Sequence, residues 1–133
     1  MQKERYRMLN EPKILAEVSG LADLYEKALG ENDLQTLDDL FYAGPETVRY
    51  GVGENLYGIE EIREFRKQRP GGSPPRDVLK RVITVIGQDA AVVDLEFQRR
   101  GGSKNGRQSQ TWFRTQHGWK ILAAHVSLMA DIS

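Results

Sequence analysis

A chain of 133 residues, 39% hydrophobic and 29% charged, has the size and balance of one soluble globular domain. Nineteen basic residues offset nineteen acidic ones, so the chain lacks the positive charge on which nucleic-acid binding depends. It has no cysteine, which excludes disulfides, thiolate metal ligands and a cysteine nucleophile. No apolar stretch reaches membrane-spanning length, so we expect no membrane contact and a cytoplasmic location.

The first predicted element is an amphipathic helix that follows a flexible or extended segment over residues 1–9. Asn10 is a suitable N-cap and Pro12 suits the first turn. Apolar residues then recur at spacings of four and three along one face: Ile14, Val18, Leu21, Tyr25 and Leu29. Gly30 is the expected end of this helix, and Gly20 weakens its middle.

Two shorter helices and a strand are predicted next. Asn32 with Gln35 resembles a capping box for a second helix over residues 34–41. After a Gly-Pro break, β-branched and aromatic residues predict a short strand over 47–51. A glycine-bearing loop follows, and helical spacing over 59–69 then predicts a third helix that ends at a proline.

The C-terminal half has the period of two that is typical of half-buried strands. Turn-forming residues divide it into four strands over 78–87, 90–100, 107–115 and 119–128, which predicts an antiparallel meander. Three amphipathic helices can bury their apolar faces only against one face of this sheet, so we expect an α+β fold. A curled sheet would make a cone with a pocket between helices and sheet.

Tyr25 lies on the apolar face of the first helix, where its hydroxyl group needs a partner. One interpretation is a core tyrosine whose hydroxyl reaches the rim of the core. The alternative is a proton donor, since a phenol keeps its proton at neutral pH and can release it to a leaving nitrogen or carbon.

Arg49 lies in the middle of the first predicted strand, between Val48 and Tyr50. An inward-pointing arginine is costly unless an anion meets it. The anion could be an internal Asp or Glu, or it could be a substrate carboxylate held by paired hydrogen bonds. The composition leaves both interpretations open.

Arg66 and Arg69 are further candidates for anion binding, although cations near the end of a helix also stabilise its dipole. His125, in the last strand, is either a hydrogen-bonded structural histidine or a base. With only one other histidine, His117, we expect no metal site.

Four segments are distinctive when taken together: TVRYGVGENLYG over 47–58, Phe65-Arg66 with Arg69-Pro70, GRQSQTW over 106–112, and GWKILAAHVS over 118–127. In this combination they resemble the AtzH/HpxZ family. The family has the SnoaL-like, nuclear-transport-factor-like cone, also called the cystatin-like fold, so the resemblance implies three helices packed on a curved antiparallel sheet.

The resemblance also implies an activity: decarboxylation of 1,3-dicarboxyurea to allophanate, in cyanuric acid or oxalurate catabolism. It suggests Tyr25 and Arg49 as catalytic residues. The other expected substrate-binding residues are Asn55, Arg66, Arg69, Gln110 and His125. A tight turn before Gly118 would place the side chains of Gln110 and His125 on opposite faces of the sheet. Both could then enter one pocket only if a β-bulge intervenes.

The expected partners are a small anionic substrate and further copies of the chain, in a dimer or a larger homo-oligomer. No cofactor is expected, because nitrogen-bound carboxylates lose CO2 without forming a carbanion. Two alternatives remain open. One is a non-catalytic ligand-binding or accessory subunit, and the other is isomerase or cyclase chemistry, for which His125 is the candidate base.

Overall fold

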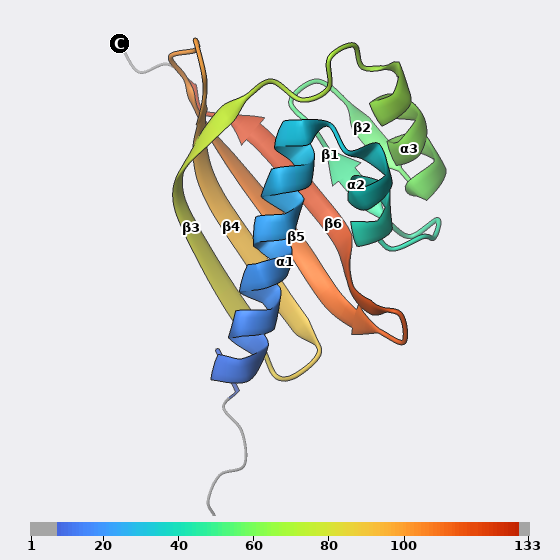
Figure 1. Cartoon of the computed structure of the whole chain (residues 1–133), viewed down its shortest axis with the longest axis vertical. Coiled ribbons are helices and arrows are strands. Elements are labelled where there is room, and N and C mark those ends of the chain that lie inside the picture. Colours follow the sequence, from blue (N-terminus) through green and yellow to red (C-terminus); the bar gives the residue numbers. More distant parts are fainter. Residues whose placement is uncertain (1–7, 131–133) are drawn as a thin grey trace, which may run out of the picture.

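The computed structural model describes residues 8–130, in which three helices cover one face of a six-stranded sheet (Figure 1). The helices are α1 (Pro12–Glu31), α2 (Leu34–Leu40) and α3 (Ile59–Gln68). The strands are β1 (Val48–Tyr50), β2 (Asn55–Tyr57), β3 (Arg76–Ile86), β4 (Ala90–Arg99), β5 (Asn105–Thr115) and β6 (Gly118–Leu128). The predicted α+β fold is confirmed, and no helix within residues 8–130 has the length and hydrophobicity to cross a bilayer.

The sheet has the strand order β2-β1-β6-β5-β4-β3. Strands β3 to β6 form the predicted antiparallel meander. The sheet as a whole is mixed, however, because β1 runs parallel to β6. β2, predicted as part of a loop, pairs antiparallel with β1 and extends the sheet by one short edge strand.

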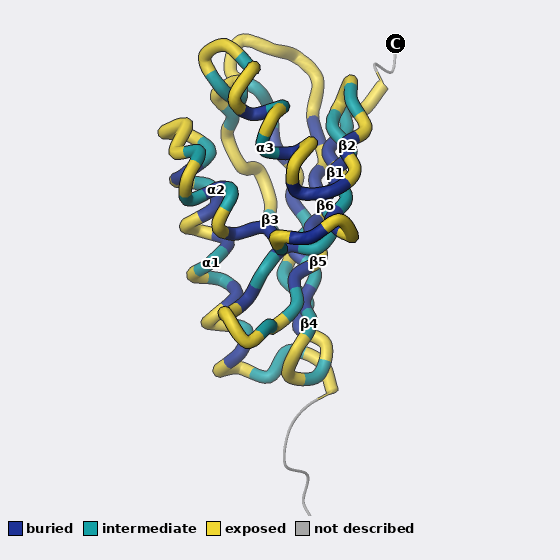
Figure 2. The backbone as a smooth tube through the Cα atoms, turned by 90° about the vertical axis from the view of Figure 1, so that its right-hand side faces the viewer, coloured by how far each residue is buried: buried dark blue, intermediate teal, exposed yellow. Residues whose placement is uncertain are grey.

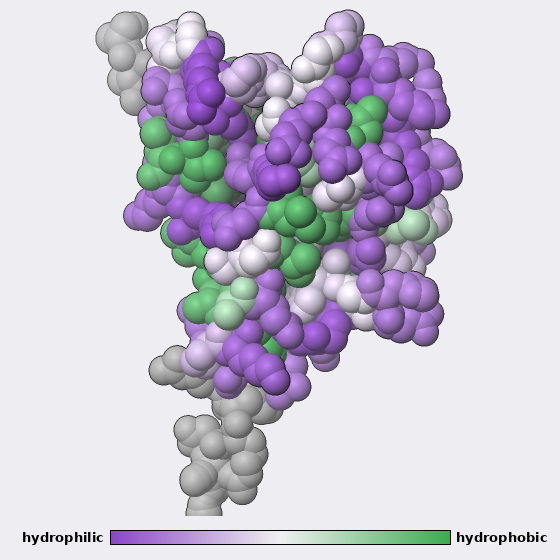
Figure 3. All heavy atoms as spheres, in the orientation of Figure 1, coloured by the Kyte–Doolittle hydropathy of each residue, from purple (hydrophilic) through white to green (hydrophobic). Residues whose placement is uncertain are grey.

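The core lies between α1 and the inner face of the sheet, as Figure 2 shows from the side. Every second residue of β4 points inward and is buried: Ala91, Val93, Leu95 and Phe97. The buried residues of α1 recur at spacings of three and four: Ile14, Val18, Ala22, Tyr25 and Ala28. On the helical face, hydrophobic patches appear over α1 and beside β3, the elements that carry the exposed Leu24 and Leu79 (Figure 3).

Strands β5 and β6 contain a β-bulge that changes which residues face inward. Near the turn Trp112 pairs with Ile121, whereas beyond the bulge Gln110 pairs with Ala124. Leu122 is therefore the extra residue of β6. Because strand side chains alternate between faces, an extra residue moves every later side chain of β6 to the opposite face.

Both asparagines that were predicted to cap helices have other roles. Asn10 binds β3, since its backbone N–H donates to Val85 O and its Oδ1 accepts from Val85 N, each at 2.9 Å. Asn32 ends α1 in a left-handed conformation with a φ of 53°. The N-cap of α2 is Asp33, whose carboxylate accepts from the backbone N–H of Thr36. The predicted caps were wrong because tertiary contacts and the α1–α2 turn use these side chains differently.

The N-terminal segment predicted over residues 1–9 lies outside the described residues, except for Met8 and Leu9. These two extend along the end of β3, where Gly87 N donates to Met8 O at 2.7 Å. Leu9 lies opposite Ile86 in an antiparallel bridge.

Candidate functional site

Four of the residues predicted from the sequence lie in one region, where α1, β1 and α3 meet. We call Tyr25, Arg49, Arg66 and Arg69 the arginine cluster. Tyr25, Arg49 and Arg66 are only 4%, 8% and 5% exposed, and Arg69 is half-buried. Each comes from a regular element or its end, so the surrounding core fixes its direction.

Two aromatic rings connect the members of the arginine cluster. The guanidinium carbon of Arg66 lies 4.6 Å from the centre of the Phe41 ring, and that ring centre is 6.4 Å from the Tyr25 ring. The guanidinium carbons of Arg49 and Arg69 lie 5.8 and 5.1 Å, respectively, from the centre of the Phe65 ring. Cation–π contacts of this kind orient a guanidinium without using its N–H donors.

Two carboxylates partly neutralise the three cations. Arg49 Nη1 donates to Glu54 Oε2 at 3.0 Å, so the internal ion pair that was one interpretation of this arginine is present. Arg66 Nη1 donates to Asp38 Oδ1. Among residues 8–130, Arg69 has no acidic side chain within ion-pair distance. Three guanidinium groups against two carboxylates leave one positive charge in excess.

Burial shapes the electrostatics of the cluster. Burial lowers the pKa of Arg66, and coulombic interactions with the neighbouring Tyr25 and the Asp38 carboxylate oppose this shift. Burial also lowers the pKa of Arg69, and the neighbouring Arg49 adds to the decrease. The four groups therefore lie within electrostatic reach of one another.

Within the described chain, four buried side-chain atoms lack a hydrogen-bond partner, and all four are donors. They are Arg66 Nη2, Arg69 Nε, Gln108 Nε2 and Gln110 Nε2. A buried donor without an acceptor is costly, so such groups are rare in folded proteins. Two of them belong to the arginine cluster. A ligand that brings oxygen acceptors and negative charge would satisfy them.

Gln110 points inward and is 1% exposed, whereas two other predicted residues lie elsewhere. Asn55 is exposed and pairs with Tyr50 at the edge of the sheet. His125 is exposed on the outer face, where its ring lies edge-on to Tyr50 at 5.5 Å. The expectation that a bulge would bring His125 and Gln110 to one face is wrong. The turn pairs Thr115 with Gly118, so an unbroken register would put both side chains on the inner face, and the bulge at Leu122 turns His125 outward instead. Neither Asn55 nor His125 reaches the arginine cluster.

Gln108 was not predicted as a site residue. It lies two residues before Gln110 and four before Trp112, so all three face inward from β5. Its amide accepts a hydrogen bond from Arg76, which also pairs with Glu26 at 2.6 Å. The sequence did contain a signal for this position: two glutamines and a tryptophan at every second residue of a strand must share one face, so a buried Trp112 implies that both glutamines are buried too.

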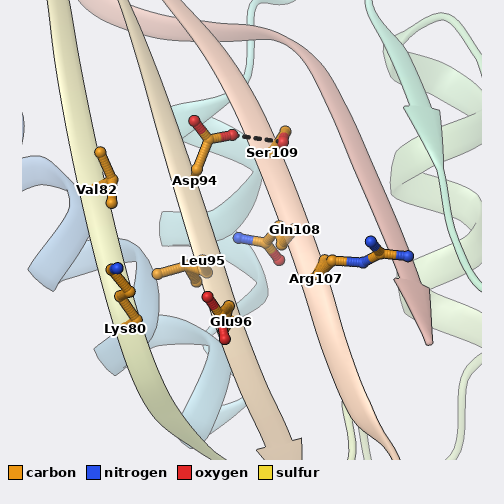
Figure 4. Close-up of a pocket in the computed structure, with 8 residues that line it drawn as sticks. All are labelled: Lys80, Val82, Asp94, Leu95, Glu96, Arg107, Gln108 and Ser109. Carbon is orange, nitrogen blue, oxygen red and sulfur yellow. Dashed lines mark hydrogen bonds between the residues drawn. The ribbon is translucent and has the colours of Figure 1, made fainter. Parts of the chain in front are cut away.

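Two hollows lie at the surface, one next to the arginine cluster and one on the outer face of the sheet. A groove of about 590 Å³ runs between α2 and the β5–β6 turn and is lined by Asp38 and Phe41, which also contact the arginine cluster. A hollow of about 280 Å³ lies over β3, β4 and β5 (Figure 4). Neither is lined by Tyr25 or Arg49. Within residues 8–130, no three His, Asp or Glu side chains gather in a metal-binding arrangement.

The model of the AtzH-like family matches residues 7–132. The chain belongs to the AtzH-like family. It is similar to a Pectobacterium atrosepticum protein of unknown function, with 52% identity and a TM-score of 0.90, over 92% of this chain and 96% of that chain. It is also similar to a cystatin-like fold protein from Burkholderia xenovorans, with 43% identity and a TM-score of 0.88, over 93% and 98%.

More distant similarity shows the fold of this AtzH-like chain but no activity. A nuclear transport factor 2-like superfamily protein from Salmonella enterica is 23% identical, with a TM-score of 0.75, over 91% of this chain and 94% of that chain. No curated protein matches the chain significantly. The cystatin-like, nuclear-transport-factor-like fold predicted from the resemblance is confirmed.

Proposed function

We propose that this AtzH-like protein is a cofactor-independent decarboxylase. Its substrate would be a small N-carboxylated urea such as 1,3-dicarboxyurea, converted to allophanate and CO2. The observation that carries the proposal is the arginine cluster: a buried excess of positive charge with unpartnered donors, next to a phenol. The family resemblance supplies the substrate class, and the cluster supplies the chemistry that this class requires.

Substrate binding would use the donors that the protein itself leaves unpartnered. Arg66 Nη2 and Arg69 Nε would donate to the carboxylate that stays on the product. Arg49 would contribute its charge while Nη1 remains on Glu54. A bound carboxylate would cancel the excess charge of the cluster.

The chemical step would need only a proton donor and a dry environment. The bond between nitrogen and the departing carboxylate breaks, CO2 leaves, and the electron pair stays on nitrogen. Tyr25 Oη gives its proton to that nitrogen, and the phenolate later takes a proton from water. The Arg66 guanidinium lies within coulombic reach of the Tyr25 phenol that would release this proton.

The test is CO2 release from freshly prepared 1,3-dicarboxyurea, measured against the rate in buffer. Tyr25→Phe keeps the ring in the core but removes the proton, so it should lower kcat at least tenfold, which is about 1.4 kcal/mol. Arg69→Gln should raise KM more than it lowers kcat. The matched controls are Tyr57→Phe and Arg63→Gln, since both side chains are partly or fully exposed and lie outside the cluster.

A rate in Tyr25→Phe equal to that of the wild type would contradict the proposal. One observation supports the alternative of a non-catalytic ligand-binding or accessory subunit: Arg49 and Arg66 already have internal acidic partners. Binding of a dicarboxylate without any CO2 release above the buffer rate would favour that alternative.

A further inference from the structure

Gln108 and Gln110 form a second polar site on the inner face of the sheet, which we call the amide pair. The two side chains are 2% and 1% exposed, and in each the nitrogen Nε2 lacks a partner among the described residues. They lie two residues apart on β5, so both point toward the helices. Neither has a role in the proposed proton transfer.

The orientation of both amide groups follows from their neighbours. Trp112 Nε1 donates to Gln110 Oε1 at 3.1 Å, and Arg76 Nη1 donates to Gln108 Oε1 at 3.1 Å. Indole and guanidinium nitrogens only donate, so each amide must turn its oxygen toward them. The amide pair therefore presents its NH2 groups to the interior, and only an acceptor can satisfy them.

The register of the sheet connects the amide pair to the arginine cluster. Gln110 lies opposite Ala124, and Ala124 lies opposite Arg49 on the next strand. All three side chains are buried on the inner face, and neighbouring strands are about 4.8 Å apart, so roughly 10 Å separates the outer two Cα atoms. Ala124 is the one residue between Arg49 and Gln110 in this row.

We propose that Gln110, supported by Gln108, is a specificity-determining residue that donates to the carbonyl oxygen of the ligand. The site would thereby select carboxylic acids that carry an amide or urea group over simple carboxylic acids of the same shape. This inference rests on the proposed function in one respect: the ligand carboxylate is placed at the arginine cluster. Beyond the proposed function, the inference adds a second contact, a hydrogen bond from Gln110 to the carbonyl oxygen of the ligand.

Two unreactive probes of equal size test this selectivity by isothermal titration calorimetry. N-carbamoylglycine has a carboxylate and a urea group. In 4-methylpentanoate the urea oxygen and terminal nitrogen are methyl groups, the carbonyl carbon is CH and the internal N–H is CH2. The wild type should bind N-carbamoylglycine at least tenfold more tightly. Gln110→Leu should bring this ratio close to one, because leucine fills the volume without a donor. Gln88→Leu, at an exposed turn position, is the matched control.

A second pair of variants tests the space between the two sites. Ala124→Val adds two methyl groups in the row between Arg49 and Gln110, so it should weaken binding of both probes at least tenfold. Ala123→Val makes the same change on the outer face and should leave both affinities unchanged. Thermal unfolding followed by circular dichroism establishes that each variant is folded.

Equal affinity of the wild type for the two probes, or binding of neither, would overturn the inference. So would a probe preference that survives Gln110→Leu in a folded protein. CO2 release reports separately on the proposed function. A protein that prefers N-carbamoylglycine through Gln110 but never releases CO2 would retain the selectivity site and refute the decarboxylase.

Discussion

The ion pair between Asp38 and Arg66 offers a direct test of how the arginine cluster is stabilised. Asp38→Asn removes the carboxylate charge and keeps the shape of the side chain. The Arg66 side chain is 5% exposed and its pKa is already lowered by burial, so it depends on the negative charge next to it. We expect the variant to be less stable than the wild type.

The structure sets the size of this effect. Removing one partner of a fully buried ion pair costs about 3–5 kcal/mol, because the other charge is left uncompensated. The Asp38 side chain is 23% exposed, and an asparagine oxygen would still accept the hydrogen bond from Arg66. The partial exposure of Asp38 and the retained hydrogen bond both reduce this cost. We therefore expect the free energy of unfolding to fall by roughly 2 kcal/mol, which lowers Tm by about 8 °C for a chain of this length.

Urea unfolding at neutral pH measures this loss, and Asp39→Asn provides the control. Asp39 is the next residue of α2 and is exposed, so its replacement should change the free energy of unfolding by less than about 0.5 kcal/mol. If the two variants were equally stable, the carboxylate of Asp38 would not compensate Arg66. The charge count of the arginine cluster would then be wrong.

Three further predictions concern stability away from the cluster. Gly20→Ala should stabilise the protein by about 0.5–1 kcal/mol in urea unfolding, because the added methyl group lies inside α1 and meets no other atom within 4 Å. Gly106→Ala should destabilise it by about 1–3 kcal/mol in the same assay, because the added atom would overlap the Phe97 ring, over which the Arg76 guanidinium lies at 4.6 Å. The side-chain and backbone hydrogen bonds from Thr36 hold the pKa of Asp33 below its ordinary value of 3.8. The stability that Asp33 contributes should thus be complete above pH 3.8 and lost as the pH falls through its folded-state pKa, so the Tm difference from Asp33→Ala should narrow in acid; a constant difference would contradict this.

Local patterns predicted most of the secondary structure. The four long strands and three helices follow from periods of two and about 3.6, which persist over ten or more residues in β4 and α1. Strand β2 was not predicted, because Asn55–Tyr57 is too short for a period and forms through pairing with β1. Asn10 fits a cap by its sequence, yet the backbone of Val85, 75 residues away, provides its hydrogen bonds.

The candidate site was predicted only in part. Tyr25 and Arg49 were identifiable because each is an unfavourable residue at an inward position, and the structure buries both. The acidic partner of Arg66 was not identifiable, since Asp38 reaches it across 28 positions of the chain. The outward direction of His125 depends on one extra residue in β6, which no local pattern reveals.

By itself, the sequence determined which residues of β4 and most of those of α1 face the core, because that choice depends on hydrophobic periodicity within a few residues. Only the tertiary structure decided which polar side chains meet. Strand register, the bulge at Leu122 and the packing of α3 bring Arg49, Arg66 and Arg69 together and align Gln110 with Arg49 across Ala124. These alignments depend on contacts between segments far apart in the chain, and a shift of one residue reverses the face of every later side chain in a strand.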